Sequence, residues 1–531
     1  MKKIVSKMFK LSLVAIVIST IFSCNQVVDK HYCKVGKVPA YNIDSIIDAL
    51  PPASRWVDHL NNELLPFWMM DEAKGNPIGK FPSCRCNDGT IPKSGKVTDC
   101  PEYEKYIKNS SNAALVKDDT IYTRVHGRQV YAYGVAYHIT GDVKYLELMK
   151  KGVDFFRNNA IDKTNGSAFS YYSGPKSKWG PEDSLKISQD MAYALSGIGF
   201  YYYLTHDKEV LPDIIGIKNY IFKTYYDKDM DMLKWCLGTQ GEDNPHRKEL
   251  VSQLDQVYAY MLWLTPSLPK EYRVEWEADL SKVADIMVKQ FFSEEYQFFW
   301  GSLTDNKYVT TQDNPSDKAN TNKSKRVGGP HTDFGHSIKT LWLIYEIGKM
   351  KNDISLLNFA REKATNLINV AYDDKSKCWT RRFDAQGNID KSKEWWSMAE
   401  LDQTTATLSL TDPSLARYIG TTYRDWFDHM VDTVNHEVWH MIDENNKPDL
   451  SYPKQHIWKN GFHSFEHALI GYMTTHTLKQ ETFTLYYAFS QGKDTAFIHP
   501  YFYNGKIVNV KKESSDVANI TKYKVEFSDL N

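Results

Sequence analysis

The chain has 531 residues, of which 42% are hydrophobic and 25% charged, so most of it should form a large globular core or two ordinary domains. Its formal net charge of −1 gives no reason to expect a nucleic acid as a partner. Aromatic residues make up 14% of the chain, a composition that suits both helix packing and the stacking of sugar faces on flat rings.

The N-terminus has the pattern of an export signal. Four lysines within the first ten residues precede a short apolar run that ends in Ile-Phe-Ser-Cys, the last residue being Cys24. This ending resembles the cleavage box of a bacterial lipoprotein, so we predict removal of residues 1–23 and lipidation of Cys24. The mature protein would be an exported lipoprotein, anchored in a membrane and facing the periplasm or the cell surface, with residues 24–45 as a loose tether.

One cysteine lies in the tether, and three more cluster in one loop that follows it. Because an exported protein can form disulfide bonds, we expect a pair among four residues, with the connectivity left open: Cys33, Cys84, Cys86 and Cys100. A zinc site is disfavoured there, since Cys-x-Cys is a poor ligand spacing and no histidine lies beside it.

A repeated pattern covers the middle of the chain. Each copy has a helical stretch, a turn led by an acidic residue or Asn, and an aromatic cluster, and the turns begin at 162, 227, 294, 373 and 435. A period of this length fits two helices and a loop. Six such pairs would close into a ring, so we predict an all-α fold, an (α/α)6 toroid over residues 46–480. An open helical array is the structural alternative.

Local signals support this helical interpretation. Asp142, Asp353 and Asp412 each precede apolar residues at helical spacing, and Asp412 is followed by a proline suited to a first turn. The end of the chain differs, because residues 482–487, 498–503 and 506–510 have strand-like patterns around an Asn-Gly pair at 504–505. We therefore predict a small β appendage over residues 481–531.

Four segments place ionisable residues at aromatic-rich helix starts. They are Arg-Val-His-Gly-Arg-Gln-Val-Tyr-Ala-Tyr at 124–133, Gly-His-Ser-Ile-Lys at 335–339, Trp-Trp-Ser-Met-Ala-Glu at 395–400 and Phe-His-Ser-Phe-Glu-His-Ala at 462–468. In this order and at these separations they resemble the N-acylglucosamine 2-epimerase family over about residues 55–478. The resemblance implies a sugar 2-epimerase or aldose–ketose isomerase that needs no cofactor and no metal.

The resemblance also implies roles for individual residues. His336 and His463 would be the acid/base pair that moves a proton at C2 of a reducing sugar, because imidazole titrates near neutral pH. Arg128 would stabilise the enediolate, since its charge is permanent. The implied substrate contacts are Tyr131, Asp190, Asp255, Lys339, Trp395, Trp396 and Glu400.

Three departures leave the sugar unassigned among an N-acyl hexosamine, a hexose and a short oligosaccharide. Lys339 stands where the family has Glu, and Ser464 stands where it has Asn, with a nearby Arg absent. Asp255 and Gln253 occupy the helix that often supplies a third histidine. The choice between epimerisation and isomerisation therefore stays open, since both pass through an enediolate.

Other functions fit parts of the sequence. A glycoside hydrolase on the same toroid would need two carboxylates, for which the candidates are Asp190, Asp255, Asp333 and Glu400. The segment 463–467 also fits the His-x-x-Glu-His zinc pattern, but no third ligand is evident. A non-catalytic sugar-binding lipoprotein is a further alternative. Phosphate-binding glycine motifs are absent, so no nucleotide is expected, and the oligomeric state stays open between monomer and dimer.

Overall fold

The computed structural model describes residues 41–92, 100–102, 119–240, 243–303, 329, 331–384, 386–490, 495–513 and 520–531. The predicted signal peptide, Cys24 and Cys33 lie outside these residues. Within them, no helix is both long enough and apolar enough to cross a membrane.

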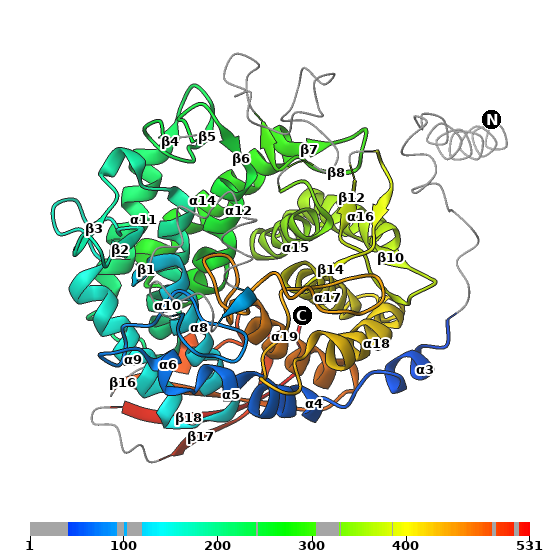
Figure 1. Ribbon diagram of the computed structural model, residues 1–531. Helices are drawn as coiled ribbons and strands as arrows, with labels where there is room; N and C mark the ends of the chain where they lie inside the picture. Colours follow the sequence, from blue (N-terminus) through cyan, green and yellow to red (C-terminus); the bar gives the residue numbers. More distant parts are fainter. Residues whose placement is uncertain are drawn as a thin grey trace, which may run out of the picture.

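Six inner helical segments surround the middle of the molecule (Figure 1). Their side chains are buried almost throughout, and in α10 every residue is buried, because each inner helix has protein on all sides. Successive inner helices pack against one another, and the last packs against the first, which closes the ring. The inner segments are α8 (Thr123–Thr140), α10 (Ser188–Thr205), α12 (Leu250–Gln256) with η4 (Val257–Met261) and α13 (Leu262–Leu264), α15 (Phe334–Lys351), α17 (Trp395–Ser409) and α19 (Phe462–Leu478).

Outer helices alternate with the inner ones along the chain and bury only one face, as an amphipathic surface helix does (Figure 1). They are α4 (Ser54–Asp58) with η1 (His59–Leu64) and α5 (Leu65–Trp68), α9 (Val143–Asn159), α11 (Leu211–Tyr225), α14 (Lys270–Ile286) with η6 (Met287–Phe291), α16 (Ile354–Ala371), and α18 (Ala416–Asp425) with η10 (Trp426–Met430). Shorter helical segments are α3 (Ile43–Asp48), α6 (Asp71–Lys74), η3 (Asp183–Leu185), η5 (Thr265–Ser267), η9 (Pro413–Leu415) and η11 (Thr495–Phe497).

The repeated turn-plus-aromatic pattern forms a β-hairpin after each of five outer helices. Three copies are two-stranded: β4 (Tyr226–Asp227) with β5 (Met232–Leu233), β7 (Phe292–Ser293) with β8 (Phe298–Phe299), and β10 (Tyr372–Asp373) with β11 (Cys378–Trp379). The other two copies are closed by single bridges, Ile161 with Ala168 and Val431 with Val438. Each hairpin leads the chain from an outer helix towards the next inner helix.

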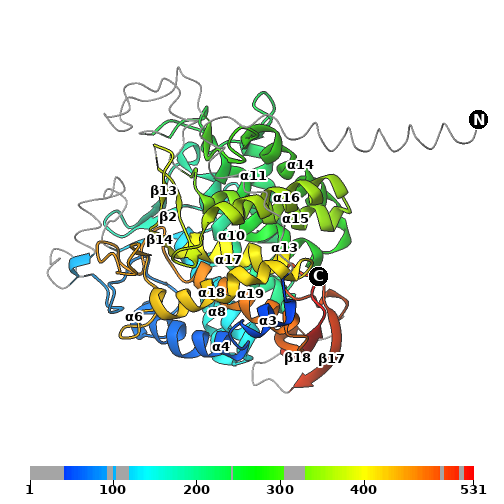
Figure 2. The ribbon, with the colours of Figure 1, turned by 90° about the vertical axis from the view of Figure 1, so that its right-hand side faces the viewer.

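Further short strands join the connecting loops. They are β1 (Thr120–Tyr122), β2 (Tyr171–Ser173) and β3 (Lys178–Gly180) in one sheet, β6 (Lys248–Glu249) with β9 (Ser302–Leu303), β12 (Arg382–Phe383) with β13 (Ile389–Asp390), and β14 (Lys393–Glu394) with β15 (Met441–Ile442). Figure 2 shows β2, β13 and β14 on the side of the molecule away from β17 and β18. The barrel therefore has a loop-rich end and a sheet-covered end.

The predicted β appendage exists, but one of its predicted strands is wrong. The sheet has the order β16 (Phe483–Ser490), β18 (Ile520–Ser528), β17 (Lys506–Glu513), with antiparallel neighbours. Residues 498–503 do not pair, because Pro500 has no amide proton and Tyr501 has a φ of +61°, and the side chains there are buried instead. The Asn-Gly pair at 504–505 is consequently not a hairpin turn, and Asn504 exchanges backbone hydrogen bonds with Asn531.

Other local predictions are confirmed in part. The carboxylates of Asp142 and Asp353 cap α9 and α16 by accepting backbone N–H groups of the first turn. Asp412 caps a 3₁₀ turn, η9, rather than α18 itself. Among the predicted cysteines, Cys86 and Cys100 form a disulfide bond.

Gly471 lies where α19 packs closely against the first outer helix, α4. A Cβ atom at this position would lie 2.3 Å from the Trp56 ring, so Gly471→Ala should lower the free energy of unfolding by about 1–3 kcal/mol. The control is Gly216→Ala in α11, where the nearest atom is 4.0 Å away and alanine should be neutral or stabilising by up to about 1 kcal/mol. Urea denaturation of both variants measures the difference, and equal stabilities would contradict the close packing.

Candidate active site

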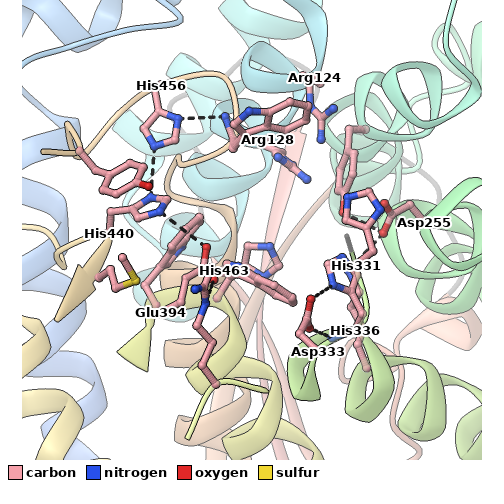
Figure 3. A pocket seen from close by; sticks show the side chains of 18 of the residues that line it. Arg124, Arg128, Asp255, His331, Asp333, His336, Glu394, His440, His456 and His463 are labelled. Atoms are coloured by element: carbon pink, nitrogen blue, oxygen red, sulfur yellow. Dashed lines mark hydrogen bonds and ion pairs between the residues drawn. The ribbon is translucent and has the colours of Figure 1, made fainter. Parts of the chain in front are cut away.

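A cavity of about 500 Å³ opens among the first turns of the inner helices. Figure 3 shows Arg128, Asp255, His336 and His463 around it. These residues come from α8, α12, α15 and α19, so helices far apart in sequence contribute to one site. Of the residues singled out in the sequence, the lining includes Arg128, Asp255, Asp333, His336, Lys339, Trp395, Trp396 and His463.

His336 lies at the start of α15 and is held by its own helix cap. Asp333 Oδ1 accepts the His336 backbone N–H at 2.7 Å, and Oδ2 lies 2.7 Å from the ring Nδ1 (Figure 3). Burial raises the pKa of Asp333, but the contacts with His336 outweigh it and lower the pKa to about 2. The carboxylate therefore stays ionised and favours a proton on Nδ1, which leaves Nε2 as the nitrogen available to a ligand.

His463 lies at the start of α19 and is only 6% exposed. Its Nδ1 is 3.0 Å from the Tyr258 hydroxyl and 3.2 Å from Glu400 Oε1. Burial lowers the pKa of His463 to about 4, although Glu400 acts in the opposite direction. The ring is therefore neutral at physiological pH. Because the Tyr258 hydroxyl donates to Glu466, it can accept a hydrogen bond from Nδ1–H of His463, which leaves Nε2 as the basic nitrogen.

The two histidines share an aromatic neighbour. The ring of Trp396 is 4.5 Å from His336 and 6.1 Å from His463, measured between centroids. Trp395 lies 6.1 Å from His463 on a second side. Both imidazoles thus border a flat apolar surface, which suits the face of a sugar ring.

A buried ion pair lies beside the histidines. Lys339 Nζ is 3.2 Å from Asp255 Oδ1, and the hydroxyl of Tyr193 donates to the same oxygen at 2.9 Å. Burial raises the pKa of Asp255, but Lys339, the hydrogen bond from Gln189 and Arg128 together lower it to about 2. Burial also lowers the pKa of Lys339, yet Asp255 outweighs this effect and raises it. Both groups are therefore charged.

Arg128 lies flat on an aromatic ring. Its guanidinium carbon is 3.4 Å from the Tyr193 ring centroid, and its buried Nε has no hydrogen-bond partner. Arg124, one helical turn earlier, donates to Gln189 and forms an ion pair with Asp190 at 3.1 Å. Arg124 is thus neutralised by a neighbouring carboxylate, whereas Arg128 presents its charge at the cavity.

Three residues predicted to contact substrate do not line the cavity. Glu400 is fully buried behind His463 and also accepts the Trp342 indole N–H at 3.1 Å. Asp190 forms an ion pair with Arg124. The Tyr131 ring stacks on Phe462 at 4.2 Å in the core. These side chains support the cavity from behind instead of facing it.

Several lining residues were not singled out in the sequence. Arg124 could have been found, since it lies four residues before Arg128 on the same helix face. Gln189 and Tyr193 lie on α10, and the others come from loops and two-residue strands, where no periodicity marks them. They are His331, Arg381, Arg382, Glu394, His440, Met441, Ser451, Tyr452, His456 and Trp458. Gln253 lies away from the cavity, because it bonds to the backbone of Leu233.

Among the described residues, two groups have side chains of the types that hold metals: Cys86, Cys100 and Glu102, and Glu400, His463 and Glu466. The sulfur atoms of the first group form the disulfide bond. In the second group the carboxylates already take part in hydrogen bonds with Trp342, Tyr258 and Tyr501. The arrangement is that of a hydrogen-bonded cluster.

The zinc alternative fails on geometry. His467 Nε2 lies 3.1 Å from Asp402 and packs against Trp56 and Trp426, whereas His463 faces the cavity. The two histidines of the His-x-x-Glu-His pattern therefore have separate partners and do not form one site.

Comparison with known proteins assigns the barrel to a family. The family model described as N-acylglucosamine 2-epimerase (GlcNAc 2-epimerase) matches residues 106–460. A cellobiose 2-epimerase from Ruminococcus albus is 25% identical over 322 residues, which cover 59% of this chain and 76% of that protein.

Solved structures share the fold. The cellobiose 2-epimerase of Spirochaeta thermophila DSM 6192 aligns with a TM-score of 0.63 at 17% identity, over 83% of this chain and all of that chain. A D-mannose isomerase aligns with a TM-score of 0.60 at 14% identity, over 82% and 99% of the two chains. The chain thus has the helical barrel of these enzymes.

The lowered pKa of His463 predicts a loss of stability in acid. Because the folded pKa of about 4 lies below the ordinary value of 6.5, the unfolded chain binds more protons between these pH values. The stability linked to His463 is complete above pH 6.5 and is lost as the pH falls towards 4. His463→Gln should therefore lose less unfolding free energy between pH 7 and pH 5 than the wild type.

Urea denaturation at both pH values measures this difference. His429→Gln, at an exposed position on η10, is the control and should behave as the wild type does. An identical pH dependence in His463→Gln and the wild type would contradict the burial of a neutral imidazole.

Proposed function

The chain belongs to the N-acylglucosamine 2-epimerase family of carbohydrate epimerases and isomerases, and we propose that it moves a proton at C2 of a reducing sugar through an enediolate. The observation that carries this proposal is the pair of cavity histidines that both contact Trp396, each with a carboxylate close to Nδ1. Two imidazoles that both direct Nε2 to the cavity can serve as base and acid in one reaction when one is neutral and the other carries a proton on Nε2.

The proton path follows from this pairing. One histidine removes the proton from C2 of the open-chain sugar, and the electron pair moves into the C1 carbonyl to give an enediolate. The other histidine enters the reaction as an imidazolium and gives its Nε2 proton to the opposite face of C2, which yields the 2-epimer and leaves the first histidine protonated in its place. Return of the proton to C1 instead would yield a ketose, so isomerisation needs only a different position of the intermediate.

Positive charge at the cavity supports the enediolate. Arg128 offers a guanidinium group without a carboxylate partner among the described residues, and Lys339 lies 4.3 Å from the Tyr258 ring centroid beside His463. A fixed cation at the developing oxyanion lowers the barrier without reorganisation. We propose Arg128 as the group that contacts the C1 oxygen.

The relatives support a reducing sugar as substrate. One is named a cellobiose 2-epimerase and another a D-mannose isomerase, so hexoses and short oligosaccharides are the first compounds to examine. N-acyl hexosamines also remain candidate substrates, because the family model is described as N-acylglucosamine 2-epimerase.

The four carboxylates considered from the sequence do not support glycoside hydrolysis. A hydrolase needs one carboxyl group that keeps its proton near neutral pH. The pKa values of Asp255 and Asp333 are both lowered to about 2, for the reasons given above, so neither can donate a proton to a leaving group. Asp190 and Glu400, the other two candidates, do not line the cavity.

Solvent exchange in D2O tests the proposed reaction. The purified protein should exchange the C2 proton of at least one sugar in a panel of hexoses, cellobiose-type disaccharides and N-acyl hexosamines, followed by proton NMR. His336→Ala and His463→Ala should each lower the exchange rate by roughly 10²–10⁴-fold, the usual contribution of general acid–base catalysis.

The exposed His429→Ala variant is the control for these substitutions. Exchange that persists in both cavity variants would overturn the assigned histidine roles. Release of a monosaccharide from an oligosaccharide, lost in Asp255→Asn, would favour the hydrolase.

We also propose, from the N-terminal sequence, that the protein is a lipoprotein attached through Cys24. In bacterial cells the wild type should fractionate with membranes and incorporate a labelled fatty acid. Cys24→Ala should abolish the label, because the thiol is the lipidation site. Membrane attachment of an unlabelled, uncleaved chain would instead indicate an N-terminal signal anchor.

A further inference from the structure

A buried carboxyl group lies directly behind His463. Glu466, three residues later on α19, is fully buried, and its Oε2 accepts a short hydrogen bond from the Tyr258 hydroxyl. The same hydroxyl lies 3.0 Å from His463 Nδ1. Tyr258 therefore connects Glu466 to the nitrogen of His463 that faces away from the cavity.

The other oxygen of Glu466 contacts the C-terminal appendage. The Tyr501 hydroxyl is 2.6 Å from Glu466 Oε1 and 2.9 Å from the Tyr131 hydroxyl. Tyr501 belongs to the segment between β16 and β17, beyond the residues 106–460 that match the family. The appendage thus reaches the active site from the sheet-covered end of the barrel (Figure 2).

Glu466 has a second buried carboxylate as a neighbour. The Gln403 side-chain amide lies 3.4 Å from Oε2 of both Glu400 and Glu466. Burial and the negative charge of Glu400 raise the pKa of Glu466, whereas contacts with His463 and Lys339 outweigh burial and lower the pKa of Glu400. Two ionised carboxylates that share one amide donor would repel each other. Glu400 and Glu466 together therefore retain one proton.

The groups that face Glu466 come from every element packed around it. Tyr258 lies on η4, Glu400 and Gln403 lie on α17, and Tyr501 lies in the C-terminal segment. Beyond them are Tyr131 on α8, behind Tyr501, and Lys339 on α15, which acts on both Glu400 and His463. Lys339 is already paired with Asp255, so it does not neutralise Glu466.

We propose that Glu466 is a positioning residue that acts as a neutral carboxyl group, held between Tyr258 and Tyr501, and that the C-terminal appendage is thereby part of the active site. In this arrangement Glu466 Oε2 accepts the Tyr258 hydroxyl, and Glu466 Oε1 and the Tyr501 hydroxyl, 2.6 Å apart, share the carboxyl proton. The Tyr258 hydroxyl proton is then directed away from His463. Nδ1 keeps its own proton and Nε2 stays basic. The kinetic consequence rests on the proposed function of His463.

Two phenylalanine substitutions in the same segment separate this role from simple packing. Tyr501→Phe removes only the hydroxyl that is bonded to Glu466 Oε1, and it should lower kcat for C2 exchange roughly tenfold with little change in KM, as expected for one lost buried hydrogen bond. Tyr503→Phe is the matched control. Tyr503 is equally buried, but its hydroxyl bonds to Thr407, so this variant should behave as the wild type does.

Substitution of Glu466 itself tests the protonation state. Glutamine has one donor and one acceptor, like a neutral carboxyl group, so Glu466→Gln should lose less than about tenfold in kcat. Glu466→Leu, which has neither group, should lose roughly 100-fold or more, since Tyr258 and Tyr501 are left unsatisfied. A carboxylate that acts in its ionised form would instead make glutamine as harmful as leucine.

Infrared spectroscopy of the full chain gives a readout that needs no turnover. At pH 7 the wild type should have a carbonyl stretching band of a neutral carboxyl group that Glu466→Gln lacks. Tyr501→Phe should shift this band, and Tyr503→Phe should not. Absence of a Glu466-dependent band, or equal spectra for the two tyrosine variants, would overturn the proposal.

The two assays distinguish the possible failures. If no sugar undergoes exchange while the band is present and responds to Tyr501→Phe, the proposed function fails and the neutral carboxyl group stands. If exchange occurs but Tyr501→Phe and Tyr503→Phe have equal kcat values, the appendage has no part in catalysis.

Discussion

The packing of α19 against α8 brings the last inner helix beside the first, and the cavity depends on this contact. The Tyr131 ring on α8 stacks on Phe462 at the start of α19, at a centroid distance of 4.2 Å. Behind this contact, Trp56 on α4 meets Gly471 on α19 so closely that a methyl group would not fit. The closed ring of helices brings His463 near cavity residues that lie more than a hundred positions earlier in the chain. A single pair of helices could not bring them together.

Inside the ring, the buried carboxylates lie next to groups that stabilise their charge. Asp333 contacts His336, Glu400 lies beside His463, and Asp255 pairs with Lys339. Burying a charge without a partner costs roughly several kcal/mol of folding free energy, so each of these contacts reduces the cost of burying the carboxylate. The pairs also have a chemical effect, since each carboxylate next to an imidazole Nδ1 leaves Nε2 free for proton transfer.

The departures from the family pattern acquire a physical explanation in three dimensions. Lys339 replaces the expected acid, and Asp255 lies in the helix where a third histidine is often found. In the folded protein these two residues contact each other at 3.2 Å. The two changes therefore form one compensated ion pair, and this pair distinguishes the cavity wall of this chain from the pattern that the resemblance implies.

The sequence by itself determined the features that depend on neighbours along the chain. The helix caps at Asp142 and Asp353 and the turns after five outer helices follow from periodicity and local residue types, whereas the motifs around His336 and His463 were identified by their resemblance to a family. Tertiary structure decided the features that join distant segments. Residues 498–503 look like a strand, yet Tyr501 reaches Glu466 instead, because the barrel end offers a buried carboxyl group and the sheet is completed by β18. Such contacts depend on how the ring of helices closes, and local sequence patterns do not indicate which distant segments will meet.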